Sequence, residues 1–291
     1  MSGSESAASL LDVSFRYSTE TGLALQEVSL DVAADSFTLV TGPSGAGKST
    51  LAKMIAGFLP RHIKGDLQGE VELLGTTLDK EGDDSPADEI GFVFDNPFDQ
   101  LTGSTRSLFD EVAFALENRG VAPELIVERV MGALSAVGLA DRMAQHPREI
   151  SGGQSQRLAM ATVIAQHQNM VVLDDPTSQL DPLGRDEVIE LTREMRGRGV
   201  TVVVVAHDLA GWLPLADALV VMDAGRIVAA GTPREVLADL DAIRHLLWVP
   251  RFVDYGRILA AEGAVDEDVL PLSARELADC LTAHTSGGTL R

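Results

Sequence analysis

The sequence predicts an α/β fold whose main element is a parallel sheet covered by helices on both faces. Two strand-length runs, residues 170–173 and 200–205, are apolar at every position except Thr201, and a helix-compatible segment separates them. Strands without alternation are typical of a sheet that is buried on both faces. Residues 11–17 and 24–32 instead alternate between apolar and polar side chains, which predicts a small antiparallel sheet attached to the core.

Composition narrows the class of protein. The 291 residues are 45% hydrophobic, which is enough for a large core in one or two domains. The net charge of −21 argues against a nucleic-acid partner, because phosphate backbones are bound by basic surfaces. Cys280 is the only cysteine, so we expect no disulfide framework and a reducing compartment. No signal peptide and no apolar run near the ~20 residues of a membrane span is seen, so a membrane role requires a partner chain.

Glycine, proline and polar residues divide the rest of the chain into short elements. We expect residues 1–9 to be disordered, segment 79–89 to be a solvated loop and residues 282–291 to form a polar tail. The other expected elements are strands at 37–41, 67–78 (two strands around Gly75), 90–94 and 218–222, and helices at 51–57, 108–137, 154–167, 182–196 and from about 241 onward.

The run GPSGAGKST at residues 42–50 matches the phosphate-binding sequence G-x-x-x-x-G-K-[ST], and it lies between a strand and a helix as such a loop requires. Glycines let backbone N–H groups turn around phosphate oxygens, and the helix N-terminus attracts the same anion. We therefore expect a P-loop NTPase that binds a nucleoside triphosphate, with Lys48 on the β- and γ-phosphates and the Ser49 hydroxyl on Mg²⁺. The expected phosphate contacts are Gly42, Pro43, Ser44, Gly45, Ala46, Gly47, Lys48, Ser49 and Thr50.

A second motif, ISGGQSQR at residues 150–157, lies between this loop and the apolar strand that ends at Asp174. It resembles the L-S-G-G-Q signature of ATP-binding cassette (ABC) ATPases. The run DDPTSQLD at residues 174–181 is similar to that family's D-E-P-T-S-A-L-D, and His207 ends the next strand as the family's switch histidine does. The resemblance implies that the signature completes the ATP site of a partner subunit, although the same residues also read as an ordinary helix cap. The expected signature contacts are Ser151, Gly152, Gly153 and Gln154.

Two further stretches resemble the ATPases of energy-coupling factor (ECF) transporters, a subgroup of that family. VFDNPFDQL at residues 93–101 is similar to V-F-Q-N-P-x-x-Q, and residues 248–277 are similar to the subgroup's C-terminal extension. The resemblance implies an ABC ATPase domain at 10–240, with a helical subdomain inserted at about 101–165, and a helical extension at 241–291 that serves as a dimerisation element.

The same resemblance implies where such a subunit works and what it contacts. It would lie peripherally on the cytoplasmic face of the membrane and dimerise head to tail with a second ABC ATPase subunit. A membrane coupling subunit and a substrate-binding membrane subunit would lie above that dimer. The assembly would drive uptake of a vitamin or a metal ion.

Individual roles follow from the residue types and from the resemblance. Tyr17 is expected to stack on adenine, or else to be an inward-facing strand tyrosine. Asp174 follows a buried strand and is expected to hold Mg²⁺ together with Ser49, rather than to act as a cap. His207 is expected to donate a hydrogen bond to the γ-phosphate, whereas Asp208 reads as the N-cap of the next helix. Lys48 is expected to act in catalysis beside His207.

Two catalytic positions depart from the family pattern. Asp175 stands where the family has a glutamate that orients or deprotonates the attacking water, and it is about 1.5 Å shorter. Asp95 stands where a glutamine contacts Mg²⁺; it can still be a ligand but adds negative charge. A misplacement of about 1 Å can cost roughly 10²-fold in rate. We therefore expect a slow site in this chain beside a faster one in a heterodimer. An Asp175 whose short reach is compensated, and a homodimer in which both residues are mutually adjusted, remain open.

Two other functions compete with import. A soluble ABC protein of ribosomes or DNA usually carries two cassettes or a long coiled-coil insertion, and neither is seen here. A regulatory module would dimerise on ATP without productive hydrolysis, and Asp95 and Asp175 are the residues that favour it.

Overall fold

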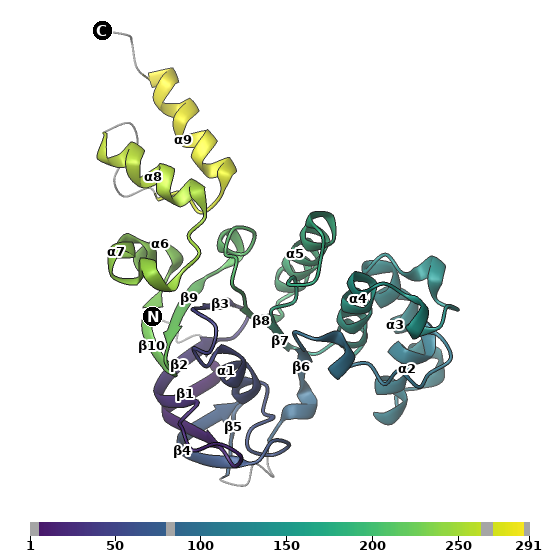
Figure 1. Cartoon of the computed structure of the whole chain (residues 1–291). Helices are drawn as coiled ribbons and strands as arrows, with labels where there is room; N and C mark the ends of the chain where they lie inside the picture. Colours follow the sequence, from purple (N-terminus) through teal and green to yellow (C-terminus); the bar gives the residue numbers. More distant parts are fainter. Residues whose placement is uncertain (1–5, 80–84, 263–269, 288–291) are drawn as a thin grey trace.

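The computed structural model describes residues 6–79, 85–262 and 270–287. In this part of the chain the strands form two sheets (Figure 1): a larger one with the order β10-β9-β3-β8-β7-β6 and a smaller one with the order β2-β1-β4-β5. Neighbours that are distant in sequence show that the larger sheet is built by crossover connections.

The larger sheet is parallel except at one edge. In the parallel part Phe37 lies beside Val202 and Met170 beside Thr201, and only the last strand runs antiparallel to its neighbour. The predicted parallel sheet is thereby confirmed. Its strands are β3 (Phe37–Thr41), β6 (Ile90–Val93), β7 (Met170–Asp174), β8 (Thr201–Val205), β9 (Ala218–Asp223) and β10 (Arg226–Gly231).

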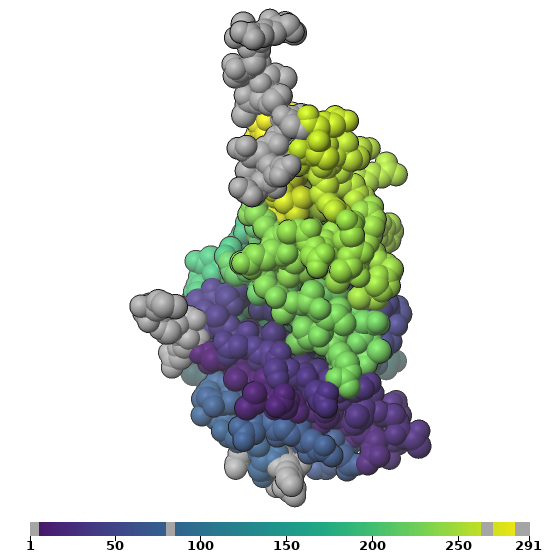
Figure 2. Space-filling model, turned by 90° about the vertical axis from the view of Figure 1, so that its left-hand side faces the viewer, coloured from purple at the N-terminus to yellow at the C-terminus, as the bar shows by residue number. Residues whose placement is uncertain are grey.

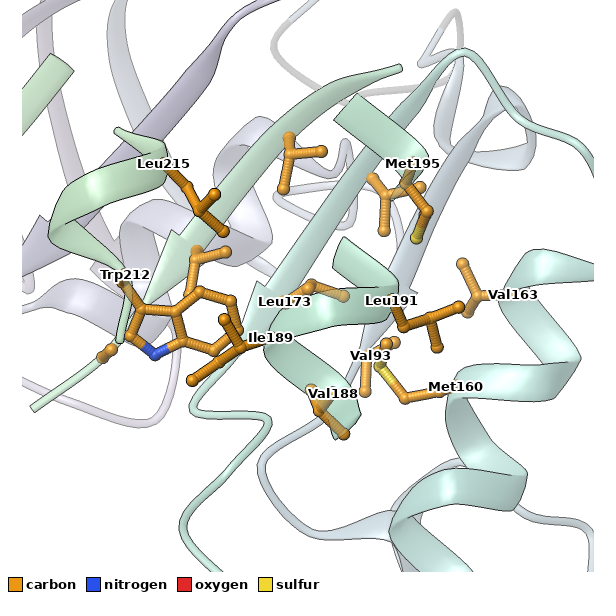
Figure 3. Close-up of a cluster of buried hydrophobic side chains, with 14 of the residues drawn as sticks. Val93, Met160, Val163, Leu173, Val188, Ile189, Leu191, Met195, Trp212 and Leu215 are labelled. Atoms are coloured by element: carbon orange, nitrogen blue, oxygen red, sulfur yellow. The ribbon is translucent and has the colours of Figure 1, made fainter. Parts of the chain in front are cut away.

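The central parallel strands are buried along their whole length, polar Thr38, Thr41 and Thr201 included, because each face of the sheet packs on its own hydrophobic cluster. Val202 and Val204 belong to one cluster, whereas Val203 and Val205 belong to the other. The first cluster includes residues of α4 (Gly152–Ile164) and α5 (Pro182–Gly197), and Figure 3 shows Trp212 and Leu173 within it. The second includes residues of α1 (Lys48–Ile55) and of the smaller sheet.

The smaller sheet corrects two expectations about the N-terminus. Its first strand begins at Ser6, so residues 6–9 are ordered; residues 1–5 lie outside the described part. Strict alternation over residues 11–17 was wrong, because a β-bulge after Leu10 adds one residue to this strand. Leu11 is therefore exposed, whereas Ser14 is buried. The strands are β1 (Ser6–Tyr17), β2 (Leu25–Ala33), β4 (Gly65–Leu73) and β5 (Thr76–Thr77).

Between β6 and β7 the chain forms helices that pack on one another at the side of the molecule away from the smaller sheet (Figure 1). They fall within the segment of about 101–165 for which an inserted helical subdomain was expected. The α-helices of this segment are α2 (Leu108–Asn118), α3 (Pro123–Ala136) and α4. Short 3₁₀ helices connect elements throughout the chain at Ala87–Glu89, Pro97–Asp99, Ala140–Arg142, Pro147–Glu149, Leu213–Leu215 and Arg244–Leu246.

The residues after β10 form a helical extension, and its first helix packs against β9 and β10. Figure 2 shows it at the end of the molecule opposite the smaller sheet. Its last helix continues to Gly287, so residues 282–287 are helical rather than a polar tail. None of the helices in the described ranges is long and apolar enough to cross a membrane. The helices after β10 are α6 (Pro233–Ala238), α7 (Leu240–Ile243), α8 (Arg251–Ala261) and α9 (Ala274–Gly287).

Candidate nucleotide-binding site

The phosphate loop connects β3 to α1, and its glycines are required by close backbone contacts. Gly42 has a φ of 142°, and a Cβ there would lie 2.1 Å from the Met222 carbonyl oxygen. Gly47 has a φ of 96°, and its Cβ would lie 2.7 Å from the Ala24 carbonyl oxygen. Side chains at these positions would collide with the backbone of β9 and with the backbone just before β2, so these neighbours determine the shape of the loop.

The Lys48 ammonium group lies inside this loop. Its Nζ donates hydrogen bonds to the carbonyl oxygens of Gly42 and Pro43, both at 2.8 Å. Burial lowers the pKa of Lys48, while the negative charges of Asp175 and Asp174 act in the opposite direction. The loop therefore holds a cation at the position where phosphate oxygens are expected.

A cleft of about 580 Å³ opens beside the loop and brings most of the predicted site residues together. Ser151–Gln154 are not among its lining residues, and Ser151 and Gly152 are exposed elsewhere on the surface. One chain thus carries the two motifs in separate places. The predicted residues that line the cleft are Tyr17, Ser44, Gly45, Gly47, Lys48, Ser49, Thr50, Asp95, Asp174, Asp175 and His207.

Asp174 and Ser49 lie together at the bottom of the cleft. The Ser49 hydroxyl donates to the Asp174 Oδ1 at 3.1 Å, and Asp174 is almost fully buried. Burial raises the pKa of Asp174; the Ser49 hydrogen bond lowers it and the charge of Asp95 raises it. These hard oxygen donors fit Mg²⁺, which usually keeps several waters and takes one or two carboxylates plus substrate phosphates. In the described residues no three acidic, His or Cys side chains are grouped to hold a metal alone.

Asp175 is held by its backbone in an unusual conformation. Its φ is 46°, and its N–H donates to the Val205 carbonyl oxygen at 2.9 Å. Burial raises the pKa of its carboxyl group, whereas the nearby His207 and Lys48 lower it. The side chain thus extends from a fixed backbone toward the cleft that it shares with His207.

Asp95 is exposed on a loop that is anchored to the helical part. Its Oδ1 accepts a hydrogen bond from the Asn96 N–H at 2.9 Å. On the same loop, the Gln100 side chain accepts from the Phe94 N–H and donates to the Ala159 carbonyl oxygen at 2.9 Å. The loop that carries Asp95 is therefore attached to the helix that begins at the signature.

Tyr17 lies at the end of β1 on the wall of the cleft and is half-buried. Its hydroxyl is 3.1 Å from the Thr50 Oγ1, and its ring packs edge to face on the buried Phe15 with 5.1 Å between centroids. Both contacts fix the orientation of the ring, so one part of it faces the cleft.

One wall of the cleft was missed by the sequence analysis. The turn at Ala224 and Gly225 between β9 and β10 lines it, together with Gln26 of β2. The Gly225 N–H donates to the Ala46 carbonyl oxygen at 3.0 Å, and the Gln26 N–H donates to the Gly225 carbonyl oxygen at 2.8 Å. The only sequence signal was the Ala-Gly pair after an apolar strand, which predicts a turn but not its neighbours. Glu20, Leu23 and Ala24 also line the cleft.

Asp208, the residue after His207, caps a turn rather than a helix, which corrects the prediction. Its Oδ1 accepts from the Ala210 N–H at 2.9 Å, and the residues that follow form a turn and a 3₁₀ helix. Its Oδ2 is 2.5 Å from Nη1 of Arg185. The arginine hydrogen bond and the Ala210 N–H lower the pKa of Asp208, against the effect of burial.

The signature forms a capping box at the start of α4. The Ser151 hydroxyl accepts from the Gln154 N–H at 3.3 Å, and the Gln154 side chain accepts from the Ser151 N–H at 2.9 Å. The prediction that these residues cap a helix is confirmed. Their exposure leaves them available to a second molecule.

The phosphate loop, the buried aspartate at the end of β7 and the capped signature helix define a P-loop ATPase of the cassette class. Comparison with known proteins agrees. The family model described as ABC transporter matches residues 25–178. A putative ABC transporter ATP-binding protein of Pyrococcus abyssi is 38% identical over 261 residues, which cover 89% of this chain and 92% of that protein. The chain therefore belongs to the ABC transporter ATP-binding family and is an ATP hydrolase.

Other relatives are similar to this chain and belong to the subgroup of energy-coupling factor transporters. The energy-coupling factor transporter ATP-binding protein EcfA1 of Bacillus subtilis is 38% identical over 264 residues, covering 89% of this chain and 91% of that protein. The structure of cbiO1 from Clostridium perfringens, described as part of the ABC transporter complex cbiONQ, matches with a TM-score of 0.70 and 29% identity over 83% of this chain and 94% of that one. A dimeric ATP-binding cassette bound to ADP and Pi matches with a TM-score of 0.68 and 25% identity, covering 77% and 98%. The resemblance to ECF ATPases is confirmed.

Proposed function

We propose that this chain is the ATP-binding and ATP-hydrolysing subunit of an ECF-type importer. The observation that carries the proposal is the position of the signature, which is exposed and lies outside the chain's own ATP cleft. A capped helix N-terminus with free N–H groups is an anion site that has no phosphate to bind within its own chain. A second ABC ATPase subunit, arranged head to tail, supplies that phosphate.

Each residue of the cleft has a role in this proposal. Lys48 and the loop N–H groups hold the β- and γ-phosphates, and the ring of Tyr17 stacks on adenine. Ser49 and Asp174 hold Mg²⁺, with Asp95 as a further ligand; the ion neutralises phosphate charge that develops during transfer. His207 donates a hydrogen bond to the γ-phosphate.

The chain's own half-site is slow in this account. The backbone of Asp175 is fixed by its hydrogen bond to Val205, so the short carboxylate does not reach the position of a glutamate. Asp95 adds negative charge near the γ-phosphate. Its carboxylate is close enough to raise the pKa of both Asp174 and Asp175. The partner of this chain is therefore a different cassette subunit with the longer glutamate, and the signature of this chain completes the faster site.

The proposed partners in the membrane are a coupling subunit and a substrate-binding subunit, and the cargo is a vitamin or a metal ion. The similarity to EcfA1 spans most of both chains, which supports the subgroup. We place the ATPase domain at residues 10–240, with its helical subdomain at about 101–165. The extension at 241–291 contributes to dimerisation. The assembly lies on the cytoplasmic face of the membrane.

A regulatory cassette half, which binds ATP without productive turnover, is the second candidate, and the short Asp175 side chain is the observation that favours it. Co-expression with the membrane proteins of the neighbouring reading frames separates the possibilities. The importer proposal expects a detergent-stable complex whose ATP turnover is lost on Lys48→Ala. Purification of the chain without any membrane subunit contradicts the importer, and a single burst of phosphate without turnover favours the regulatory reading.

A further inference from the structure

An ion pair between Arg185 and Asp208 lies next to His207, which lines the ATP cleft. The Arg185 Nη1 is 2.5 Å from the Asp208 Oδ2, and Asp208 is the residue after His207. The other oxygen of Asp208 accepts from the Ala210 N–H at 2.9 Å. Because both carboxylate oxygens are engaged, the backbone that follows His207 is held on two sides.

Arg185 is well anchored for this purpose. It lies in the first turn of α5, where its N–H donates to the Asp181 carbonyl oxygen at 2.9 Å. The Asp181 side chain caps the same helix through the Gly184 N–H at 2.8 Å. Because α5 begins only a few residues after Asp175, Arg185 belongs to the segment that carries Asp175. Asp208 belongs to the segment that carries His207, so the ion pair connects the two segments.

A second cleft, of about 770 Å³, shares Asp175 and His207 with the first. Asp175, His207, Arg185 and Asp208 all line it. The backbone of Asp208 also forms an isolated parallel bridge with Trp248, at the start of the C-terminal extension. Asp208 is thus the point at which α5, the His207 segment and the extension meet.

We propose that Arg185 is a positioning residue for ATP hydrolysis, which holds Asp208 and through it places His207 in the cleft. The inference rests on the role proposed above for His207. Both partners are partly exposed, at 26% and 42% of their side-chain areas, so the pair contributes little to global stability. A displacement of about 1 Å at a catalytic group can instead cost roughly 10²-fold in rate. We therefore expect loss of the pair to lower the rate of ATP hydrolysis and to change the stability of the protein little.

The same helix provides a matched control at its other end. The Arg196 Nη2 is 2.5 Å from the Asp217 Oδ1, and the Asp217 Oδ2 accepts from the Phe37 N–H at 2.8 Å. The side chains are 36% and 43% exposed. The chemistry and burial resemble those of the first pair, but this pair is not among the residues lining either cleft.

The test compares Arg185→Met, Asp208→Asn and Arg196→Met in the full chain with its assembled partners. Phosphate release from bound radiolabelled ATP is measured under single-turnover conditions, and the rate compared is that of the slow phase, which belongs to this chain's own half-site. ATP affinity and Tm are measured alongside. We expect the first two variants to lose about tenfold or more in rate, with ATP affinity within about twofold and Tm within about 2 °C of wild type. Arg196→Met is expected to show the same small change in Tm and no loss of rate, and Arg185→Lys to recover part of the rate.

The dependence on His207 is tested by repeating Arg185→Met in a His207→Ala background, where we expect no additional loss. A wild-type rate in Arg185→Met overturns the inference, as does an equal loss in Arg196→Met or a full additional loss without His207. A wild-type rate in His207→Ala overturns the proposed role of His207 itself. The two failures are therefore distinguishable.

Discussion

Substituting Gly47 by alanine tests whether the loop's shape is set by its neighbours. The residue has a φ of 96°, which costs a side chain about 1–2 kcal/mol. The new Cβ would also lie 2.7 Å from the Ala24 carbonyl oxygen and 3.3 Å from the Gly225 Cα, and such overpacking costs about 1–3 kcal/mol. The sum is about 2–5 kcal/mol.

This cost is expected to appear in ATP affinity because the loop is the part that can move. The Gly47 carbonyl oxygen accepts the first hydrogen bond of α1, from the Leu51 N–H at 2.9 Å, so a shift also turns the helix N-terminus. At 1.4 kcal/mol per tenfold, we expect the Kd for ATP to rise at least about 30-fold. Isothermal titration calorimetry of the purified chain measures it.

Gly75→Ala is the matched control. Gly75 has a φ of 77°, but a Cβ there would meet no atom within 4 Å, so the substitution carries strain alone. We expect a small loss of Tm and an unchanged Kd for ATP. Wild-type ATP affinity in Gly47→Ala would refute the reasoning.

Two further substitutions test the wall of the ATP cleft and the loop at residues 102–105 of the helical part. Tyr17→Ala is expected to weaken ATP binding by about 1 kcal/mol, or roughly fivefold, through loss of ring stacking, while Tyr17→Phe keeps the affinity; equal losses in both variants would mean that the hydroxyl matters instead. Glu111 is 3% exposed and accepts from the Thr102 N–H and from the hydroxyls of Thr102 and Thr105. Glu111→Ala is expected to cost about 3 kcal/mol in urea unfolding, because hydrogen bonds to a buried carboxylate are lost. A change near zero, like that expected of exposed Glu117→Ala, would contradict the stated role.

The sequence predicted the parallel sheet and the phosphate loop because their signals are local. The strand at 200–205 is apolar except for Thr201, and each of its faces meets a separate cluster. The glycines that shape the loop are close in sequence to Lys48, whose ammonium group lies inside it. The exposed position of Ser151 came from the family resemblance, since a capping box alone does not say what lies in front of it.

Features that depend on distant parts of the chain could not be predicted. The bulge after Leu10 arises from pairing with β2, and the ordered residues 6–9 pair with Ala33 and Leu73 at either side. Local polarity favoured disorder there, but two neighbouring strands override it. Gly225 meets Gln26 across almost 200 residues of sequence, and no pattern within the turn indicates that contact.

We propose that this chain binds ATP firmly but hydrolyses it slowly at its own half-site, because Asp175 is short and its backbone is fixed. The most direct measurement is single-site turnover of the purified chain, with and without Asp175→Glu. We expect slow hydrolysis by the wild type and an increase approaching about 10²-fold in the variant, at similar ATP affinity. Hydrolysis at ordinary ABC rates by the chain alone, with no increase in Asp175→Glu, would contradict it.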